Sequence, residues 1–260
     1  MSDWNFLAVI GRVFLAFLEQ TGRLCLFTWR AVINIPLPPI FVRAIGAQMM
    51  RIGYFSLPVV GMTAFFTGGV LALQIYIGGS RFNAEQIVPQ IVQLGITREL
   101  GPVLAGLMVA GRVSAAIAAE IGTMRVTEQI DALSTLSTNP YKYLIAPRLI
   151  AAVVTLPLLV LVADIIGIMG GFIVATQSLG FNASAYIQNT MTFLEVGDVT
   201  SGLWKAAVFG FIIALMGCYN GFYSRGGAQG VGAATTNAVV TASILILAAN
   251  YLMTSLLFSS

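Results

Sequence analysis

Long apolar stretches separated by short polar segments make up most of the chain. A helix needs about 20 apolar residues to cross the hydrocarbon core of a membrane, and each of these stretches reaches that length. Two of them carry no charged side chain, and each of the others carries between one and three. The pattern predicts five transmembrane helices, over residues 52–80, 86–119, 149–176, 202–222 and 231–258.

The second stretch, residues 86–119, is longer than one membrane crossing requires. Its 34 residues would extend about 51 Å as a straight helix, against about 30 Å of hydrocarbon. The helix must therefore tilt, bend or continue beyond the bilayer. The pair Gly101-Pro102 is the expected position of a kink.

The basic residues are distributed unequally between the two sides of the predicted spans. Of the 13 Lys and Arg residues, ten fall in the N-terminal segment or in loops on the same side, whereas the opposite loops hold only Arg81. Arg98 and Lys205 lie within spans. Because Lys and Arg accumulate on the cytoplasmic side of membrane proteins, we expect a cytoplasmic N-terminus and a periplasmic C-terminus.

The N-terminal segment, residues 1–40, is amphipathic. At about 100° per residue, four charged residues fall on one narrow stripe and the other faces are apolar; the four are Arg12, Glu19, Arg23 and Arg30. We expect a helix that lies in the cytoplasmic membrane interface and ends at the proline-rich hinge 35–40. A sixth, short transmembrane helix is the alternative that the sequence leaves open.

Composition supports a membrane protein. Hydrophobic residues make up 58% of the chain and charged residues only 9%, too few to cover a water-soluble globule of this size. The chain contains no histidine, which excludes histidine-based catalysis and histidine metal ligands. Cys25 and Cys218 are expected to be buried thiols rather than a disulfide. The net charge of +3 is too small to indicate nucleic-acid binding.

The most polar part of the chain lies between the second and third predicted spans. Over about residues 119–138, charged and apolar residues are mixed as in an amphipathic helix; the candidate contact residues are Glu120, Met124, Arg125, Glu128 and Asp131. The residues alone leave two interpretations open. The helix packs on the membrane surface or on its own bundle, or it docks into a groove of a cytoplasmic partner.

The centre of the chain also contains five motifs in succession. They are Arg98-Glu-Leu-Gly-Pro-Val103, Ala110-Gly-Arg-Val-Ser-Ala115, Ala119-Glu-Ile-Gly-Thr-Met124, Thr127-Glu-Gln-Ile-Asp-Ala-Leu133 and Ala146-Pro-Arg148. Together these motifs resemble the MlaE permease family, the membrane subunits of ABC transporters that work with Mce-domain proteins in lipid trafficking. The resemblance extends over about residues 46–258.

The resemblance implies an all-α integral membrane protein, with an interfacial helix followed by a five-helix permease domain over residues 41–260. It implies a homodimer in the bacterial inner membrane, with each protomer resting on a separate ABC ATPase subunit. A periplasmic Mce-domain ring would be a further partner, and phospholipid the substrate. Residues 119–138 would then form the coupling helix that contacts the ATPase.

The chemistry of ATP hydrolysis is expected to lie in another chain. This sequence contains no G-x-x-x-x-G-K-[ST] phosphate loop, and its glycine-rich stretch 226–232 lacks the Lys-Ser/Thr end. We expect that stretch to be a flexible cytoplasmic loop. ATP and Mg²⁺ would bind to the partner ATPase, so this chain is expected to be a non-catalytic subunit without a cofactor.

Arg98 and Glu99 lie near the middle of a predicted span, where a charge costs at least about 2.5–3.5 kcal/mol. Neighbours on a helix project about 100° apart, so the two cannot simply neutralise each other and each needs a partner or a wet cavity. We expect Arg98 to meet a lipid phosphate, because a guanidinium matches phosphate bidentately. Glu99 is expected to hold another basic group or a water. The resemblance places these charges near the lipid route.

Two further charges lie within predicted spans. Lys205 would add a second cation to the lipid site or extend toward the interface, and both interpretations stay open. Asp164 is expected to form a buried hydrogen bond to a neighbouring helix.

Small residues in the first span suit the close approach of a second helix; they are Gly61, Gly68, Gly69, Gly78 and Gly79. Gly78, together with Leu71, Gln74 and Phe82, could line a cavity for acyl chains. Core packing alone would give the same pattern.

Two other functions remain open on the residues alone. An ion-coupled secondary transporter would use Glu99 and Asp164 as a relay and would work without an ATPase. A non-transporting membrane scaffold would only tether partners on the two sides of the membrane.

Overall fold

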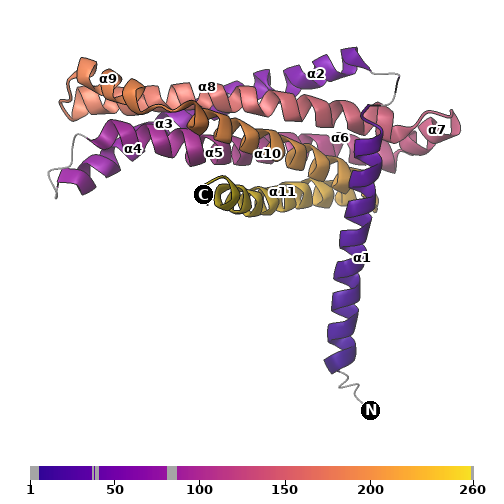
Figure 1. Ribbon diagram of the computed structural model, residues 1–260. Coiled ribbons are helices and arrows are strands. Elements are labelled where there is room, and N and C mark those ends of the chain that lie inside the picture. The colour runs from indigo at the N-terminus through magenta and orange to yellow at the C-terminus, as the bar shows by residue number, and fades with distance from the viewer. Residues whose placement is uncertain (1–5, 37, 39–40, 81–86, 259–260) are drawn as a thin grey trace.

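The structure, a computed structural model, describes residues 6–36, 38, 41–80 and 87–258, and within these residues it is helical without a strand (Figure 1). The α-helices are α1 (Phe6–Ile33), α2 (Val42–Ile52), α3 (Leu57–Ser80), α4 (Val88–Gly95), α5 (Gly101–Val109), α6 (Ala115–Val126), α7 (Gln129–Thr135), α8 (Ala146–Ser178), α9 (Ala183–Phe193), α10 (Val196–Phe222) and α11 (Gly227–Phe258). A short 3₁₀ helix, η1 (Tyr54–Ser56), and three π-helical segments, η3 (Ile96–Leu100), η4 (Ala110–Ser114) and η5 (Tyr141–Ile145), join some of them.

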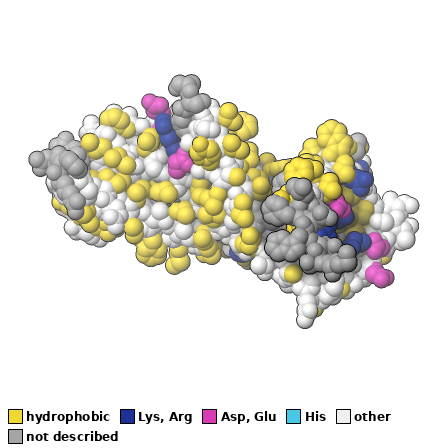
Figure 2. Space-filling view, turned by 90° about the horizontal axis from the view of Figure 1, so that it is seen from below, with side chains coloured by type: hydrophobic (Ala, Val, Ile, Leu, Met, Phe, Trp, Pro, Cys, Tyr) yellow, Lys and Arg dark blue, Asp and Glu magenta, His cyan; other side chains and the backbone are white. Residues whose placement is uncertain are grey.

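The predicted spans are confirmed. Within the described residues, five helical stretches are long and apolar enough to cross a membrane: Val42–Ser80, Val88–Val126, Tyr141–Ser178, Val196–Phe222 and Gly227–Leu257. Most extend beyond the predicted apolar windows, because the helical backbone continues into the polar residues that flank them. Figure 2 shows hydrophobic side chains over most of one face of the bundle, with a small group of charged side chains within it.

Two π-helical segments interrupt the α-helical hydrogen bonding of the second span. The span passes from α4 through the π-helical segment η3 into α5, and then through η4 into α6. The pair Gly101-Pro102 begins α5 directly after η3, so the helix continues there and is not broken. Pro102 has no N–H, so it cannot form the bond to the Arg98 carbonyl that an α-helix would place there. A π-turn beside such a position is typical of functional segments.

The long helix α8 lies at the centre of the bundle, and α3, α10 and α2 pack along it. Small residues allow its closest contact, as the sequence predicts. A Cβ atom added at Gly68 of α3 would lie 1.8 Å from the carbonyl oxygen of Gly167, and one added at Gly170 would lie 2.2 Å from that of Phe65. Gly78 differs, because no atom lies within 4 Å of its position for a Cβ.

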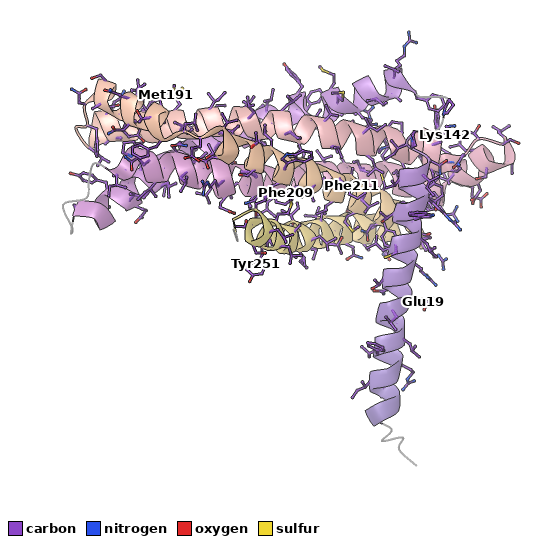
Figure 3. The ribbon with its side chains drawn as sticks, viewed as in Figure 1. Glu19, Lys142, Met191, Phe209, Phe211 and Tyr251 are labelled. Carbon is purple, nitrogen blue, oxygen red and sulfur yellow. The ribbon has the colours of Figure 1, made fainter. Side chains whose placement is uncertain are left out.

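Helix α1 leaves the bundle crosswise, and only its C-terminal part contacts the other helices (Figure 1). Phe27 is buried there among aromatic rings, with centroids 5.4 Å from Tyr141 and 5.4 Å from Tyr219. Lys142 donates a hydrogen bond to the Pro38 carbonyl at this junction, and Figure 3 shows Glu19 farther out on α1. In the described part of the chain, α1 is not among the helices suited to cross a membrane, which argues against a sixth span.

Three expectations from the sequence are wrong. The polar segment 119–138 is not one helix, because α6 ends at Val126 and Glu128 adopts a left-handed backbone conformation (φ 60°) before α7 begins. The glycine-rich stretch 226–232 is not a loop, because α11 begins at Gly227. Cys218 is buried as expected, but Cys25 is exposed on α1.

The contact between α3 and α8 predicts a difference between two glycine substitutions. Gly68→Ala should lower the free energy of unfolding by about 1–3 kcal/mol, because the new methyl group collides with backbone that cannot move independently. Gly78→Ala, the matched control, should cause no loss, because the position is open and alanine favours helix by about 1 kcal/mol. Reversible unfolding in detergent micelles measures both, and equal effects would refute the packing argument.

Candidate functional site

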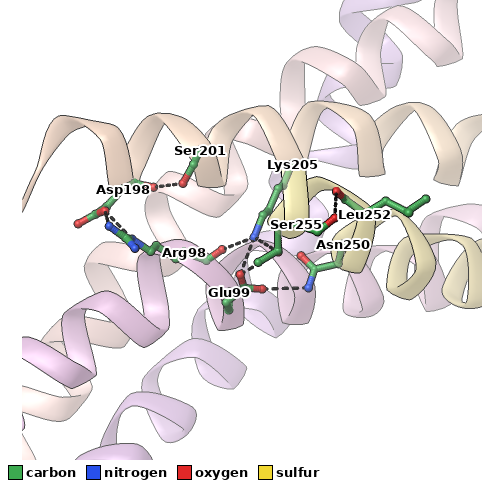
Figure 4. A network of polar contacts seen from close by, with 9 residues as sticks. Arg98, Glu99, Asp198, Ser201, Lys205, Asn250, Leu252 and Ser255 are labelled. Atoms are coloured by element: carbon green, nitrogen blue, oxygen red, sulfur yellow. Dashed lines mark hydrogen bonds and ion pairs between the residues drawn. The ribbon is translucent and has the colours of Figure 1, made fainter. Parts of the chain in front are cut away.

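Two ion pairs join the π-helical segment η3 to α10 (Figure 4). In the first, the Arg98 guanidinium lies 2.5 Å from Oδ1 of Asp198. The Arg98 side chain is 30% exposed and that of Asp198 only 2%. Asp198 therefore holds the guanidinium in place, and the Arg98 side chain as a whole stays partly exposed.

The second ion pair is more deeply buried. Nζ of Lys205 lies 2.7 Å from Oε1 of Glu99, and the Lys205 side chain is fully buried. The ammonium also donates to the carbonyl oxygen of Arg98 at 2.9 Å and to Oγ1 of Thr254 at 2.8 Å. These three acceptors match the three N–H donors of an ammonium group.

The last span completes the coordination of Glu99. Asn250 donates from Nδ2 to Oε2 of Glu99 at 2.9 Å, and Thr254 donates to Oε1 at 2.9 Å. Both residues belong to α11, whereas Glu99 and Lys205 belong to η3 and α10. One polar network therefore links three of the membrane-spanning stretches. We call it the charged network: Arg98, Glu99, Asp198, Lys205, Asn250 and Thr254.

The local sequence explains why α10 meets η3 here. Asp198 and Lys205 are seven residues apart, so their side chains lie on one face of the helix. Gly202 lies between them on α10, and a Cβ atom added there would lie 2.4 Å from the carbonyl oxygen of Thr97. The absence of a side chain at Gly202 brings the two backbones close enough for both ion pairs.

An apolar groove lies along α3 and meets the second span at Leu100. It has a volume of ≈ 340 Å³ and is lined by Phe66, Thr67, Val70, Leu71, Gln74 and Leu100. Leu100 directly follows Glu99 in the chain, but neighbouring side chains on a helix do not face each other, and no residue of the charged network lines the groove. The groove suits the hydrocarbon part of a ligand.

The structure brings only some of the predicted lipid-contact residues together. Leu71 and Gln74 line the groove, whereas Arg98 and Glu99 belong to the charged network and do not line it. Lys205 lies in the interior as the partner of Glu99, so it is not an open second cation. Gly78 does not line the groove, and Phe82 lies outside the described residues.

The predicted coupling residues make contacts within the chain. Oε2 of Glu120 lies 2.9 Å from the Arg148 guanidinium of α8, and Oε1 lies 3.4 Å from that of Arg51 of α2. Arg125 and Asp131 pair with each other at 2.6 Å across the break between α6 and α7.

The other two predicted coupling residues differ in exposure. Met124 packs partly buried against the core, whereas Glu128 is exposed at the break itself. Glu128 thus stands at the exposed turn between α6 and α7.

Asp164 has no hydrogen bond within the described residues, contrary to expectation. Its side chain is buried in α8, and neither carboxylate oxygen has a partner there. A Cβ atom added at Gly101 would lie 1.9 Å from its Oδ1. The carboxyl group therefore fills the space left by a glycine of the second span.

Sequence reasoning missed Asp198, Asn250 and Thr254. The seven-residue spacing from Asp198 to Lys205 could have indicated one shared helix face. Asn250 and Thr254 are four residues apart in an otherwise apolar stretch, a spacing that also places two polar groups on one face. Which charge each would meet depends on the packing of three helices.

Comparison with known proteins gives consistent matches. The family model described as permease MlaE matches residues 45–256. A probable ABC transporter permease protein of Rickettsia conorii is 58% identical over 255 residues, which cover 98% of each chain. A similarly named protein of Synechocystis is 40% identical over 81% of this chain and 80% of its own length. The intermembrane phospholipid transport system permease protein MlaE of Haemophilus influenzae is 32% identical over 98% of each chain.

The buried ion pair predicts how the charged network responds to substitution. Glu99→Gln should lower the free energy of unfolding by about 3 kcal/mol, because fully buried Lys205 loses its counter-charge. Adding Lys205→Met should restore much of that stability, since the unpaired charge is removed. Denaturation in detergent micelles, followed by circular dichroism, measures the change.

Glu19→Gln is the matched control for that prediction. It removes an exposed pair with Arg23 and should cost less than about 1 kcal/mol. If Glu99→Gln alone and Glu99→Gln with Lys205→Met lowered the free energy of unfolding equally, the unpaired charge of Lys205 would not be the cause of the loss.

Proposed function

The chain belongs to the MlaE permease family and is a multi-pass membrane permease, and from this premise we propose that it moves phospholipids between the inner and outer membranes as the transmembrane subunit of an ABC transporter. The name of the Haemophilus influenzae relative, an intermembrane phospholipid transport permease, supports the substrate class. The proposed location is the bacterial inner membrane.

The observations that carry the proposal are the apolar groove and the charged network, which contact the second span at the neighbouring residues Leu100 and Glu99. Acyl chains would fit the walls formed by Leu71 and its neighbours, and a lipid phosphate would pair with the guanidinium of Arg98, whose side chain is partly exposed. A guanidinium offers five N–H donors, so Arg98 can keep its bond to Asp198 while it binds a phosphate oxygen. Lys205 and Asn250 hold Glu99 away from that phosphate.

We propose that two copies of the chain enclose the lipid. The last span exposes a row of large apolar side chains along α11 that a second copy would cover: Val240, Ile244, Leu247, Tyr251 and Leu256. Figure 3 shows Tyr251 pointing away from the bundle, whereas Phe209 lies inside it. Because Asn250 and Thr254 also lie on α11, such an interface would adjoin the charged network.

ATP hydrolysis would drive transport from a separate subunit that binds ATP and Mg²⁺, since this sequence has no phosphate loop. That ATPase would dock at the end of the bundle where α7 lies, with α1 in the membrane interface beside it (Figure 1). The end that carries α9 would then face the periplasm and an Mce-domain ring. This orientation follows the distribution of basic residues.

The contacts around α6 suggest how a push on the coupling segment would travel. The pair Arg125–Asp131 joins α7 to the end of α6. Glu120 then joins α6 to α8 through Arg148 and to α2 through Arg51. Movement of α7 would therefore shift three helices together, which is rigid-body motion of the kind that alternating access requires.

Removal of the Arg98 guanidinium should slow lipid movement. In proteoliposomes containing the chain and its ATPase, Arg98→Gln should lower the rate of lipid transfer about tenfold, the scale of one lost charge-assisted hydrogen bond. Lys142→Gln, a basic residue at the other end of the bundle, should leave the rate unchanged. A purely tethering scaffold would show normal transfer with Arg98→Gln, and a secondary transporter would work without the ATPase.

Reversal of the exposed charge at the turn should affect coupling. Glu128→Lys should detach the ATPase or uncouple its hydrolysis from lipid transfer, while the chain still inserts into the membrane. Glu19→Lys on α1 reverses an exposed charge outside the turn and serves as the control. Copurification and lipid-stimulated ATPase activity measure the effect, and normal activity in Glu128→Lys would contradict docking at this turn.

A further inference from the structure

A second charged groove lies at the other end of the spans, near the coupling segment. It has a volume of ≈ 160 Å³ and lies between α2, η1 and the segment η4–α6. Its polar lining comes from Gln48, Arg51, Arg112 and Glu120, and its apolar walls include Phe55 and Ile117. We call it the basic groove.

Positive charge exceeds negative charge around the basic groove. Glu120 faces two guanidinium groups, that of Arg148 at 2.9 Å and that of Arg51 at 3.4 Å. Arg112 contacts only neutral acceptors within the described residues, namely the hydroxyl of Ser56 and the carbonyl oxygen of Arg51. In this part of the described chain three guanidinium groups thus accompany one carboxylate, which leaves an excess of two positive charges.

The position of Arg112 is fixed before any ligand arrives. Its Nε and Nη2 atoms lie 3.1 Å and 2.9 Å from Oγ of Ser56. Ser56 is buried and donates its own hydrogen bond to the Ile52 carbonyl at 2.6 Å. A guanidinium held in this way binds an anion without first losing side-chain freedom. Arg51, whose side chain is 63% exposed, can turn toward the same anion.

The apolar walls decide between the sources of such an anion. Phe55 is 58% exposed beside the two arginines, whereas Ile52, Val113 and Ile117 line the groove from buried positions. Free phosphate gains nothing from Phe55, whereas a lipid gains from burying its hydrocarbon against that ring. Basic pockets between membrane helices are suited to anionic headgroups.

From these contacts we propose that the basic groove binds the phosphate of an anionic phospholipid, at a site separate from both the apolar groove and the charged network. In the orientation proposed above, on which this placement rests, the basic groove lies in the cytoplasmic leaflet. The bound phosphate would draw Arg51 from its long contact with Glu120 and leave Glu120 on Arg148. Because Glu120 lies on α6 just before the coupling turn, the lipid composition of this leaflet would affect the coupling segment.

Native mass spectrometry of the full-length chain, titrated with dioleoyl phosphatidylglycerol or dioleoyl phosphatidylcholine, tests the site. The wild type should retain phosphatidylglycerol in preference to phosphatidylcholine. The double variant Arg51→Gln with Arg112→Gln should bind phosphatidylglycerol about tenfold more weakly, the order expected for a lost charge-assisted hydrogen bond. Its binding of phosphatidylcholine should not change, and an unchanged preference for phosphatidylglycerol would overturn the proposal.

Three variants separate this site from other effects. Arg43→Gln removes an exposed charge from the same helix α2 outside the groove and should leave the preference intact; an equal loss would show general electrostatics and overturn the proposal. Arg51→Gln alone leaves Arg148 on Glu120 and should weaken binding while the melting temperature stays unchanged. Arg98→Gln should keep the preference, so a failure of the proposed transport site is distinguishable from a failure here.

Competition distinguishes the source of the anion. Neither inorganic phosphate nor glycerol 3-phosphate should displace phosphatidylglycerol at equal concentration, because neither reaches the apolar walls. Displacement by either would mean that the groove recognises a free phosphate, and it would overturn the assignment to a lipid.

Discussion

The structure depends on one constraint: the adjacent charges Arg98 and Glu99, inside the membrane-spanning bundle, each need a partner from another helix. Arg98 and Glu99 are neighbours, so they project in different directions and cannot satisfy each other. Asp198 and Lys205 resolve this because they are seven residues apart on α10 and reach both charges from one face. The two ion pairs together fix the rotation of α10 against η3, and Asn250 and Thr254 attach α11 to the same point.

The balance of charge differs between the two ends of the bundle, and the difference suits different tasks. In the charged network two cations face two anions, so the site as a whole is neutral. A neutral site would attract a phosphate only through the partly exposed Arg98 side chain and could release it again. Around the basic groove, within the described residues, three guanidinium groups lie near one carboxylate, so an anion bound there would be held more firmly.

The sequence predicted the five spans and the helical N-terminal segment, because long apolar or periodic patterns indicate each of them. The family could be recognised because its motifs consist of adjacent residues. The sequence did not predict the partners of Arg98 and Glu99, since these come from residues about 100 and 150 positions away. The left-handed conformation of Glu128 was equally hidden, because that conformation usually favours glycine. Asp164 fits a gap above Gly101 that exists only once two helices are packed.

The backbone irregularity of the second span and its buried charges are linked rather than independent. Pro102 lacks the N–H that would bond to the Arg98 carbonyl in a regular α-helix, and the ammonium of Lys205 donates to that same oxygen. Gly202 allows this by bringing α10 against the Thr97 carbonyl. Pro102 and Gly202 thus leave a backbone acceptor available to Lys205, and Glu99 provides the counter-charge. Lys205 is therefore fully buried because backbone and side chain together offer it as many acceptors as it has donors.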